Sequence, residues 1–340
     1  FGFVPLLCAD AIADQCKIKK FWICHYLTFV LWNAATTFWV CNATMAGGIF
    51  AILVNALQMS IVWGIFRLSK KHFHGVIPYI FLAAMWIAWE KEYFNLQISW
   101  PWLTLGNAFA GSVESVQWYE YTGSIGGSLW VWVSNLTIFG LIVMFSDGLW
   151  KRWNVLARLS SILVSVIVIF GPFVASRMIS DNYQERSEGK VNVIIAQPNF
   201  DPYQKFQSMS QAQQNDVLTG LFKSELARDK SRTPVLLIGP ETFTGDIVLN
   251  DMAKSATWST MNAFLKEYPY AEMLFGASTY QIFNTRTSPS ILARKYGDGW
   301  IESHNSAFLI DSKGGSEMYH KSKLVVGTEL TPYPKIFVPL

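Results

Sequence analysis

The residues best suited to chemistry lie in the second half of the sequence, and Glu241 is the first of them. It follows the apolar run PVLLIG at 234–239, which has the composition of a buried strand. Ligands bind at the carboxyl ends of strands in α/β sheets, where a half-buried carboxylate has a raised pKa and suits general-base work. Taken alone, a glutamate in this position is more often an N-cap or turn carboxylate.

A second charged stretch, YHKSKLVVGTELTPYP, covers residues 319–334. Lys321 and Lys323 are two residues apart, so they would share one face of an extended segment. A lysine beside a carboxylate can hold an oxyanion by charge and hydrogen bonding. The alternative is a solvated edge strand that lysines guard against aggregation. Glu329 follows, and by itself it could be a loop carboxylate bonded to nearby backbone.

Short apolar runs after residue 190 predict the elements that position these side chains. The expected strands are 191–197, 234–239, 272–280 and 306–311, with a hairpin turn at 311–315. Expected helices cover 211–230 and 256–268. The first is amphipathic, and its apolar side would carry Val217, Leu218, Leu221, Phe222 and Leu226. Strands that alternate with helices predict a layered α/β domain.

The first half of the sequence has the composition of a protein in lipid. The 340-residue chain is 51% hydrophobic and 15% charged, against roughly 25% charged in soluble domains. Charged residues are sparse before about residue 176 and frequent after it. Five segments approach the ~20 apolar residues that a span needs: 21–41, 45–66, 75–90, 125–145 and 158–176. Residues 1–13 could be the tail of another span or a re-entrant piece.

Loop charges predict the orientation of these spans. Nine basic residues lie in the loops 14–20, 67–74 and 146–158. The opposite side has only Lys91 and Arg177. The positive-inside rule then puts the first set in the cytoplasm and everything after residue 176 outside.

The predicted organisation is therefore a helical membrane region at 1–176 with five to six spans, a polar linker at 177–190 and an α/β domain at 191–340. The outer loop 91–124 is rich in Trp and Tyr. Such a loop is typical of an interfacial aromatic belt, and it could also serve as a lid or acyl-chain guide under the domain.

Cysteines and net charge exclude several classes of function. The four cysteines all precede residue 42, so no disulfide or zinc site can form within the polar half: Cys8, Cys16, Cys24 and Cys41. The net charge of +3 is small and gives no indication of nucleic-acid binding.

Several motifs occur in the order seen in one known family. They are FGFVPLL at 1–7, SWPWLTLGNAFA at 99–110, QWYEYTGSIGGSLWVWVSN at 117–135, VIIAQPNFDPYQKF at 193–206, HNSAFLID at 304–311 and the stretch 319–334. Together they resemble the apolipoprotein N-acyltransferase family, over nearly the whole chain. The polar half alone resembles the nitrilase (carbon–nitrogen hydrolase) superfamily.

The resemblance implies a nitrilase-like αββα sandwich, incomplete at its C-terminus, with a Glu–Lys–Cys triad and no cofactor or metal. Glu241 would be the general base and Lys321 the oxyanion lysine, while Glu329 would support the lysine and the reacting groups. Lys323 falls on a variable position of the motif.

Two aromatic residues are implied to bind substrate, Trp102 in the outer loop and Phe206 after the first strand of the domain. Phe206 stands where the family typically has Trp. The family's Pro-Phe-Gly before the second glutamate is VGT here, at 326–328.

The nucleophile is the largest departure from the family. Its cysteine lies well downstream of the lysine motif, whereas this sequence has no cysteine after Cys41. The sequence also begins with Phe. We therefore expect a protein truncated at both ends, and inactive as it stands because the attacking thiol is missing.

The implied reaction moves a fatty acyl chain through a thioester. A membrane phospholipid would be the acyl donor, and the N-terminal amine of a diacylglyceryl-cysteine lipoprotein would be the acceptor. The implied location is the bacterial cytoplasmic (inner) membrane, with a multi-pass anchor in the lipid bilayer and a catalytic domain that faces the periplasm.

Two other functions stay open at this point. A membrane-anchored amidase or nitrilase would use the same triad with water as acceptor, although it would not need five or six spans. A non-enzymatic transporter or scaffold is the other alternative. The sequence indicates no charged pair inside a span and no broken-helix repeat, which argues against transport.

Overall fold

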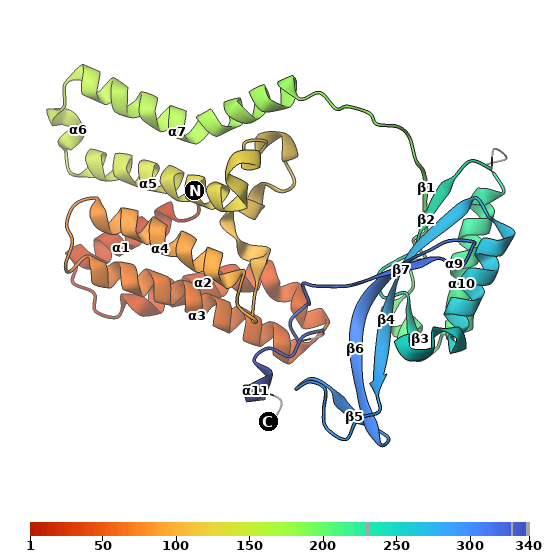
Figure 1. Ribbon diagram of the computed structural model, residues 1–340. Helices are drawn as coiled ribbons and strands as arrows, with labels where there is room; N and C mark the ends of the chain where they lie inside the picture. Colours follow the sequence, from red (N-terminus) through yellow and green to blue (C-terminus); the bar gives the residue numbers. More distant parts are fainter. Residues whose placement is uncertain (229–231, 328, 338–340) are drawn as a thin grey trace. The chain divides into compact units, whose positions relative to one another are not determined.

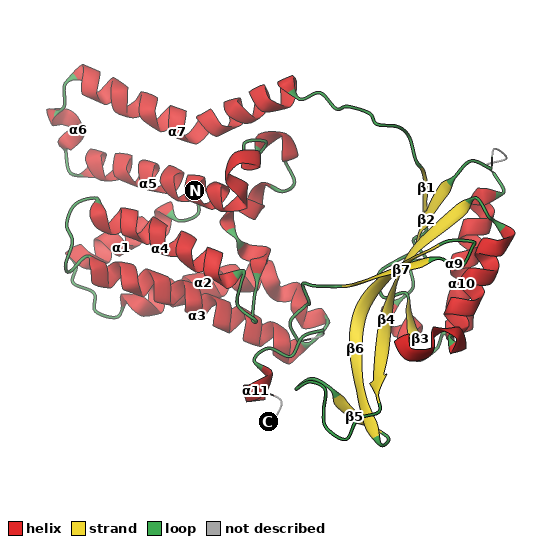
Figure 2. Ribbon diagram, in the orientation of Figure 1, coloured by secondary structure: helices red, strands yellow, loops and turns green. Residues whose placement is uncertain are grey.

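The computed structural model describes residues 1–228, 232–327 and 329–337, and the chain divides into two compact units, Phe1–Glu185 and Arg186–Leu340 (Figure 1). The first unit is helical and the second is built on a sheet (Figure 2). A helical region followed by a domain of mixed strands and helices is therefore confirmed.

Helices of the first unit correspond to all five predicted spans. They are α1 Val4–Gln15, α2 Phe21–Thr37, α3 Met45–Ser69, α4 Ile77–Tyr93, α5 Tyr119–Ser146, α6 Leu149–Arg152 and α7 Val155–Asn182. Among the described residues, α3, α5 and α7 are long and apolar enough to cross a membrane. The helices α2 and α4 have 17 residues each, which is short for a span.

The helix α7 continues through 177–182, which the sequence predicted to be linker. Polar composition suggested a linker, yet no Gly or Pro interrupts this segment. The side chains of Arg177 and Asp181, one turn apart, form an ion pair at 3.1 Å, which favours helix here.

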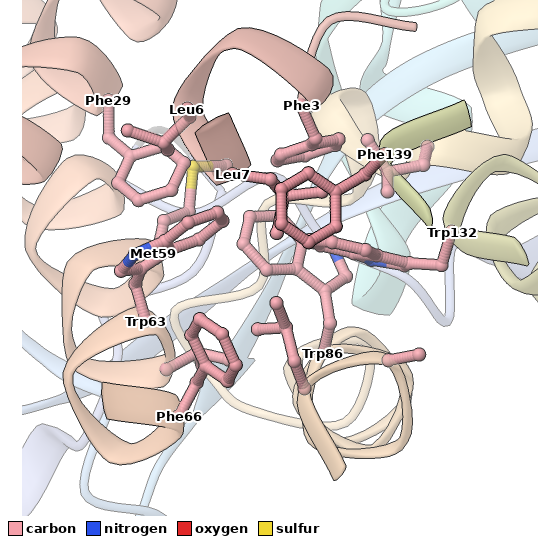
Figure 3. Close-up of a cluster of buried hydrophobic side chains, with 14 of the residues drawn as sticks. Phe3, Leu6, Leu7, Phe29, Met59, Trp63, Phe66, Trp86, Trp132 and Phe139 are labelled. Carbon is pink, nitrogen blue, oxygen red and sulfur yellow. The ribbon is translucent and has the colours of Figure 1, made fainter. Parts of the chain in front are cut away.

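Large aromatic side chains form the core of the first unit (Figure 3). Trp63 of α3, Trp86 of α4 and Trp132 of α5 are all fully buried, and the ring of Phe3 stacks on Trp132 at 4.4 Å. In lipid there is little hydrophobic drive between helices, so close packing of this kind holds them together.

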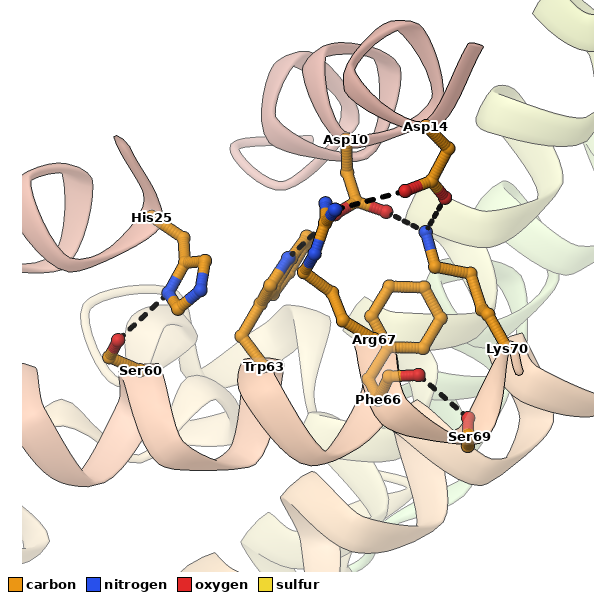
Figure 4. A network of polar contacts seen from close by, with 9 residues as sticks. All are labelled: Asp10, Asp14, His25, Ser60, Trp63, Phe66, Arg67, Ser69 and Lys70. Carbon is orange, nitrogen blue, oxygen red and sulfur yellow. Dashed lines mark hydrogen bonds and ion pairs between the residues drawn. The ribbon is translucent and has the colours of Figure 1, made fainter. Parts of the chain in front are cut away.

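A polar network ties α1 to the end of α3 (Figure 4). Arg67 and Lys70 each form ion pairs with both Asp10 and Asp14. Asp10 is buried and also accepts a hydrogen bond from Trp63 at 3.4 Å. Arg67 stands in the last turn of α3, one residue beyond the predicted span 45–66, so the absence of a charged pair inside a span stays a prediction. Some 57 residues separate the partners, and local pattern does not show such a pairing.

The loop between α4 and α5 is anchored to the helices by a buried carboxylate. Oε1 of Glu90 accepts hydrogen bonds from the indole of Trp86 at 3.1 Å and from the backbone N–H of Leu105 at 3.0 Å. The backbone N–H of Gly106 donates to Ser128 Oγ of α5 at 3.0 Å. The loop contains three short 3-10 helices, η2 Pro101–Leu103, η3 Leu105–Phe109 and η4 Val113–Ser115. Its role as belt or lid stays a prediction.

Seven strands form one mixed sheet within the described part of the second unit. The elements are β1 Asn192–Ile195, α8 Pro202–Gln207, α9 Gln211–Leu226, β2 Val235–Ile238, β3 Thr244–Val248, η5 Leu249–Lys254, α10 Ala256–Glu267, β4 Ala271–Phe283, β5 Arg294–Tyr296, β6 Gly299–Ile310, β7 Ser316–His320 and α11 Pro334–Phe337. The strand order is β1-β2-β4-β6-β5, with β3 also beside β4 and β7 beside β6.

All four predicted strands and both predicted helices of this unit are present, although residues 229 and 230 of the predicted helix 211–230 lie outside the described residues. The strands β3 and β5 were not predicted, because the sequences TGDIV and RKY have little strand pattern. Each segment forms a strand by pairing with a neighbour, β3 with β4 and β5 with β6. The strand β7 ends at His320, so Lys321 follows the strand instead of lying on it.

Helices α9 and α10 cover one face of the sheet and enclose its core. The buried side chains include Leu218, Phe222, Leu226, Leu237, Met261, Leu265, Met273 and Phe275. Val217 and Leu221, predicted to lie on the buried side of α9, are each 38% exposed. The buried apolar stripe of α9 is thus narrower than predicted and follows every fourth residue, 218, 222 and 226.

We expect Leu218→Ala to lower the free energy of unfolding of the second unit by about 2–5 kcal/mol, because it removes a fully buried side chain from a packed core. Leu221→Ala, the same change one turn along, should cost less than half as much. Denaturant unfolding of the purified protein would measure both, and equal losses would contradict this account of the core.

Candidate active site

Glu241 lies in the turn that follows β2. The backbone N–H of Gly239 donates to the carbonyl of Leu274 in β4 at 2.8 Å, so the parallel pairing of β2 with β4 continues past Ile238. The turn comes at the carboxyl end of β2, the edge at which α/β sheets commonly bind ligands.

Lys321 reaches the same region from the end of β7, which pairs with β6. Its backbone N–H donates to the carbonyl of Asn305 in β6 at 2.8 Å, which extends the β6–β7 ladder by one residue. Side chains alternate along strands, so Ser306 and His320 face the helices, whereas Asn305 and Lys321 face the opposite side. The candidate site therefore lies on the face that α9 and α10 leave uncovered.

Four side chains meet at this point in one hydrogen-bonded cluster. Lys321 Nζ is 2.9 Å from Glu241 Oε1 and 3.1 Å from Glu329 Oε1. Asn305 Nδ2 donates to the same two carboxylates, at 2.8 Å to Glu241 and 2.6 Å to Glu329. The second oxygen of Glu329 accepts from the backbone N–H of Val325 at 2.8 Å. The structure thus brings together all three residues predicted as catalytic.

Asn305 is the member of the cluster that sequence reasoning missed. It stands in the quoted motif HNSAFLID, one residue before the expected strand 306–311. A polar amide that alternates with the buried Ser306 was the available signal, because it implied an amide on the uncovered face.

The electrostatics of Glu241 differ from the sequence-based prediction. Its side chain is 64% exposed, not half-buried as predicted. The hydrogen bond from Lys321, followed by the one from Asn305, lowers the pKa of the Glu241 carboxyl below its ordinary value. The prediction of a raised pKa is therefore wrong. The direction of the shift is set by the ammonium of Lys321, which lies 80 residues downstream in the sequence.

The other two charges shift in the same sense, toward their ionised forms. Burial tends to raise the pKa of Glu329, but hydrogen bonds from Val325, Asn305 and Lys321 outweigh burial, and that pKa is lowered. The hydrogen bond to Glu241 raises the pKa of Lys321. At neutral pH the cluster therefore holds two carboxylates and one ammonium.

A pocket of about 290 Å³ opens beside this cluster. Its charged rim is formed by Glu241 and Lys321. The apolar part of its lining comes from Ile238, Leu274, Ala307 and the ring of Tyr319. An apolar floor next to a carboxylate and an ammonium could hold a substrate with an apolar body and a polar reacting end.

The structure assigns the remaining predicted residues to the following elements. Trp102 belongs to η2 of the first unit, is 64% exposed and packs beside Trp39 and Trp100 at ring distances of 5.9 and 6.4 Å. Phe206 lies in α8, and its side chain is outside the described residues. Lys323 is exposed.

Backbone hydrogen bonds form a tight turn beside Glu329, close to the departure VGT at 326–328. Gly327 has φ of +89°, a conformation that glycine adopts easily, and its N–H donates to the carbonyl of Leu330 at 2.9 Å. The backbone N–H of Glu329 donates to Val325 at 3.0 Å. Thr328 lies outside the described residues.

Comparison with known proteins agrees with the resemblance seen in the motifs. Residues 1–137 match the family described as the apolipoprotein N-acyltransferase N-terminal domain. A curated protein of Chlorobaculum tepidum named Apolipoprotein N-acyltransferase is 23% identical over 349 aligned residues. The match covers 99% of this chain and 61% of that protein, so the chain spans about three fifths of its relative's length.

We expect Lys321→Met to raise the pKa of both Glu241 and Glu329, since it removes the ammonium that each carboxylate contacts. Carboxyl ¹³C NMR titration of glutamate-labelled protein, assigned with Glu241→Gln, would measure this. Lys323→Met removes an exposed lysine from the same stretch and should leave both values unchanged.

The sign of the stability effect follows from these shifts. Lowered carboxyl pKa values stabilise the fold above their ordinary value of 4.5, and this is lost as pH falls through the lowered pKa. The raised pKa of Lys321 means that its ammonium stabilises the fold fully below pH 10.5. This stabilisation is lost as the pH rises through the raised pKa. Unchanged glutamate pKa values in Lys321→Met would contradict the cluster.

Proposed function

We propose, from the similarity of this chain to apolipoprotein N-acyltransferases, that it serves acyl transfer from a phospholipid to the N-terminal amine of a diacylated lipoprotein. The observation that carries the proposal is the cluster around Lys321, where one ammonium contacts the carboxylates of Glu241 and Glu329 beside an apolar pocket. An acyl ester has the matching form, an apolar chain that ends in a carbonyl.

The proposed fold of the second unit is nitrilase-like, and its proposed location is the periplasmic side of the inner membrane. Support for the fold comes from the two helices on one face of the sheet and the polar cluster on the other. The three apolar helices and the basic loops of the sequence support a multi-pass anchor that leaves this unit outside.

In the proposed first step, Glu241 takes the proton of a cysteine thiol, and the thiolate attacks the ester carbon of the phospholipid. The S–C bond forms, the ester C–O bond breaks, and the leaving alkoxide takes the proton back from Glu241. Since residues 42–340 contain no cysteine, the proposed thiol comes from outside them. The lowered pKa of Glu241 keeps it ionised, and so able to accept the proton, at neutral pH.

The second step repeats this chemistry with the amine. Glu241 takes a proton from the neutral amine of the lipoprotein as its nitrogen attacks the thioester carbon. The N–C bond forms, the C–S bond breaks, and the thiolate recovers a proton from Glu241. In each step, Lys321 supplies positive charge to the developing oxyanion. Glu329 and Asn305 hold Lys321 and Glu241 in place.

We expect Glu241→Gln and Lys321→Met each to lower acyl transfer by about 10²–10⁴-fold, because they remove the proton acceptor and the oxyanion charge. Lys323→Met, which changes an exposed lysine of the same stretch, should stay within about twofold of wild type. The assay uses the full-length protein in vesicles, with a phospholipid labelled in its acyl chain and a diacylated lipopeptide.

Each outcome of this assay favours one function. Wild-type-like transfer by a folded Glu241→Gln or Lys321→Met protein would refute the assigned roles. Release of labelled fatty acid into water, with no labelled lipopeptide, would indicate the amidase or nitrilase alternative. Binding of lipopeptide without any turnover by the wild type would indicate a scaffold.

A further inference from the structure

We infer that Lys205 is a positioning residue for Glu241, and that it acts by holding the carbonyl of Thr242, the next residue in the chain. This inference rests on the proposed function for what Glu241 does, but not for where Glu241 is held. Lys205 lies in α8 and donates from Nζ to the Thr242 carbonyl at 2.7 Å. Thirty-seven residues separate the two.

The turn that carries Glu241 needs such support because its backbone is strained. Thr242 has φ of +52°, in the left-handed region that a β-branched residue rarely occupies. A residue in this region is strained and persists only when its surroundings fix it. Glu241 immediately precedes Thr242, so a relaxation of Thr242 would redirect the Glu241 side chain.

One side of the turn is fixed by β4. The backbone N–H of Gly276 donates to Pro240 at 3.1 Å, and that of Phe243 donates to the Gly276 carbonyl at 2.9 Å. A Cβ at Gly276 would lie 2.7 Å from both the Glu241 Cα and the Thr242 nitrogen, so only glycine lets the turn approach this closely. The ends of the turn are thus bonded to the sheet.

The Thr242 carbonyl is fixed from a different element. Lys205 reaches it from α8, whose backbone is tied to α9 because Gln214 Nε2 donates to the Lys205 carbonyl at 3.1 Å. The lysine is half-buried and lines a second pocket with Phe243, Asp246 and Tyr280. Burial lowers the pKa of Lys205 below its ordinary value.

A merely structural lysine and a positioning lysine predict different measurements. If Lys205 fixes the Glu241 turn, its loss should weaken the contact between Glu241 and Lys321. That contact lowers the pKa of Glu241, so the pKa should rise when Lys205 is removed. A structural role alone would reduce stability and leave the Glu241 pKa where it is.

The test compares Lys205→Met with Lys205→Arg in the full-length protein. Lys205→Met keeps the length of the side chain and removes the donor. It should raise the Glu241 pKa in ¹³C NMR titration and move the acidic limb of the kcat/KM profile to higher pH. It should also lower kcat about 10–100-fold with KM within about twofold, since misplacement affects the reacting geometry. Lys205→Arg keeps a donor and should restore most of each quantity.

Lys313→Met, an exposed lysine of the β6–β7 turn, is the matched control and should change none of these values. An unchanged Glu241 pKa in folded Lys205→Met would overturn the inference. If Lys205→Met does not fold, Lys205→Gln replaces it, because its shorter side chain cannot reach Thr242. The NMR titration needs no turnover, so it tests Lys205 even if the proposed acyl transfer fails.

Discussion

The register of the antiparallel ladder between β4 and β6 is the constraint on which the site depends. It runs unbroken from Met273 opposite Ile310 to Phe283 opposite Trp300, with β2 attached along one side and β7 along the other. A slip of one residue would turn Asn305 toward the helices and carry Lys321 with it, because the Lys321 backbone is bonded to Asn305. The burial of Phe275 and Phe308 on the helix-covered face prevents that slip.

The two units use their ionic groups in different ways. In the first unit, Asp10 and Asp14 face Arg67 and Lys70, so two negative charges meet two positive ones and the cluster is neutral. Such compensation is expected where the alternative is an unpaired charge among apolar helices. In the second unit the groups around Lys321 stay partly open to water, which allows an unequal balance.

Local sequence pattern was sufficient to predict most helices and strands, but not to predict which side chains share a face of the sheet. The apolar runs that became β2, β4 and β6 could be read directly, because strands buried on one or both sides need such residues. The contact of Asn305 with Glu241 could not, because it depends on a register set by distant pairing. For the same reason the pKa of Glu241 was predicted with the wrong sign, since Lys321 is 80 residues away. Thr242 gave no signal at all, as positive φ at threonine has no sequence pattern.

The unequal balance around Lys321 has a consequence for how substrates arrive. Glu241, Glu329 and Lys321 together carry a net charge of minus one at neutral pH. A field of that sign attracts an ammonium group and repels a phosphodiester. In the proposed reaction the acceptor amine would be steered toward the site by its charge, whereas the donor would bind through the apolar contacts of its acyl chain. Added salt would then slow the arrival of the acceptor and ease that of the donor, because it screens the attraction and the repulsion alike.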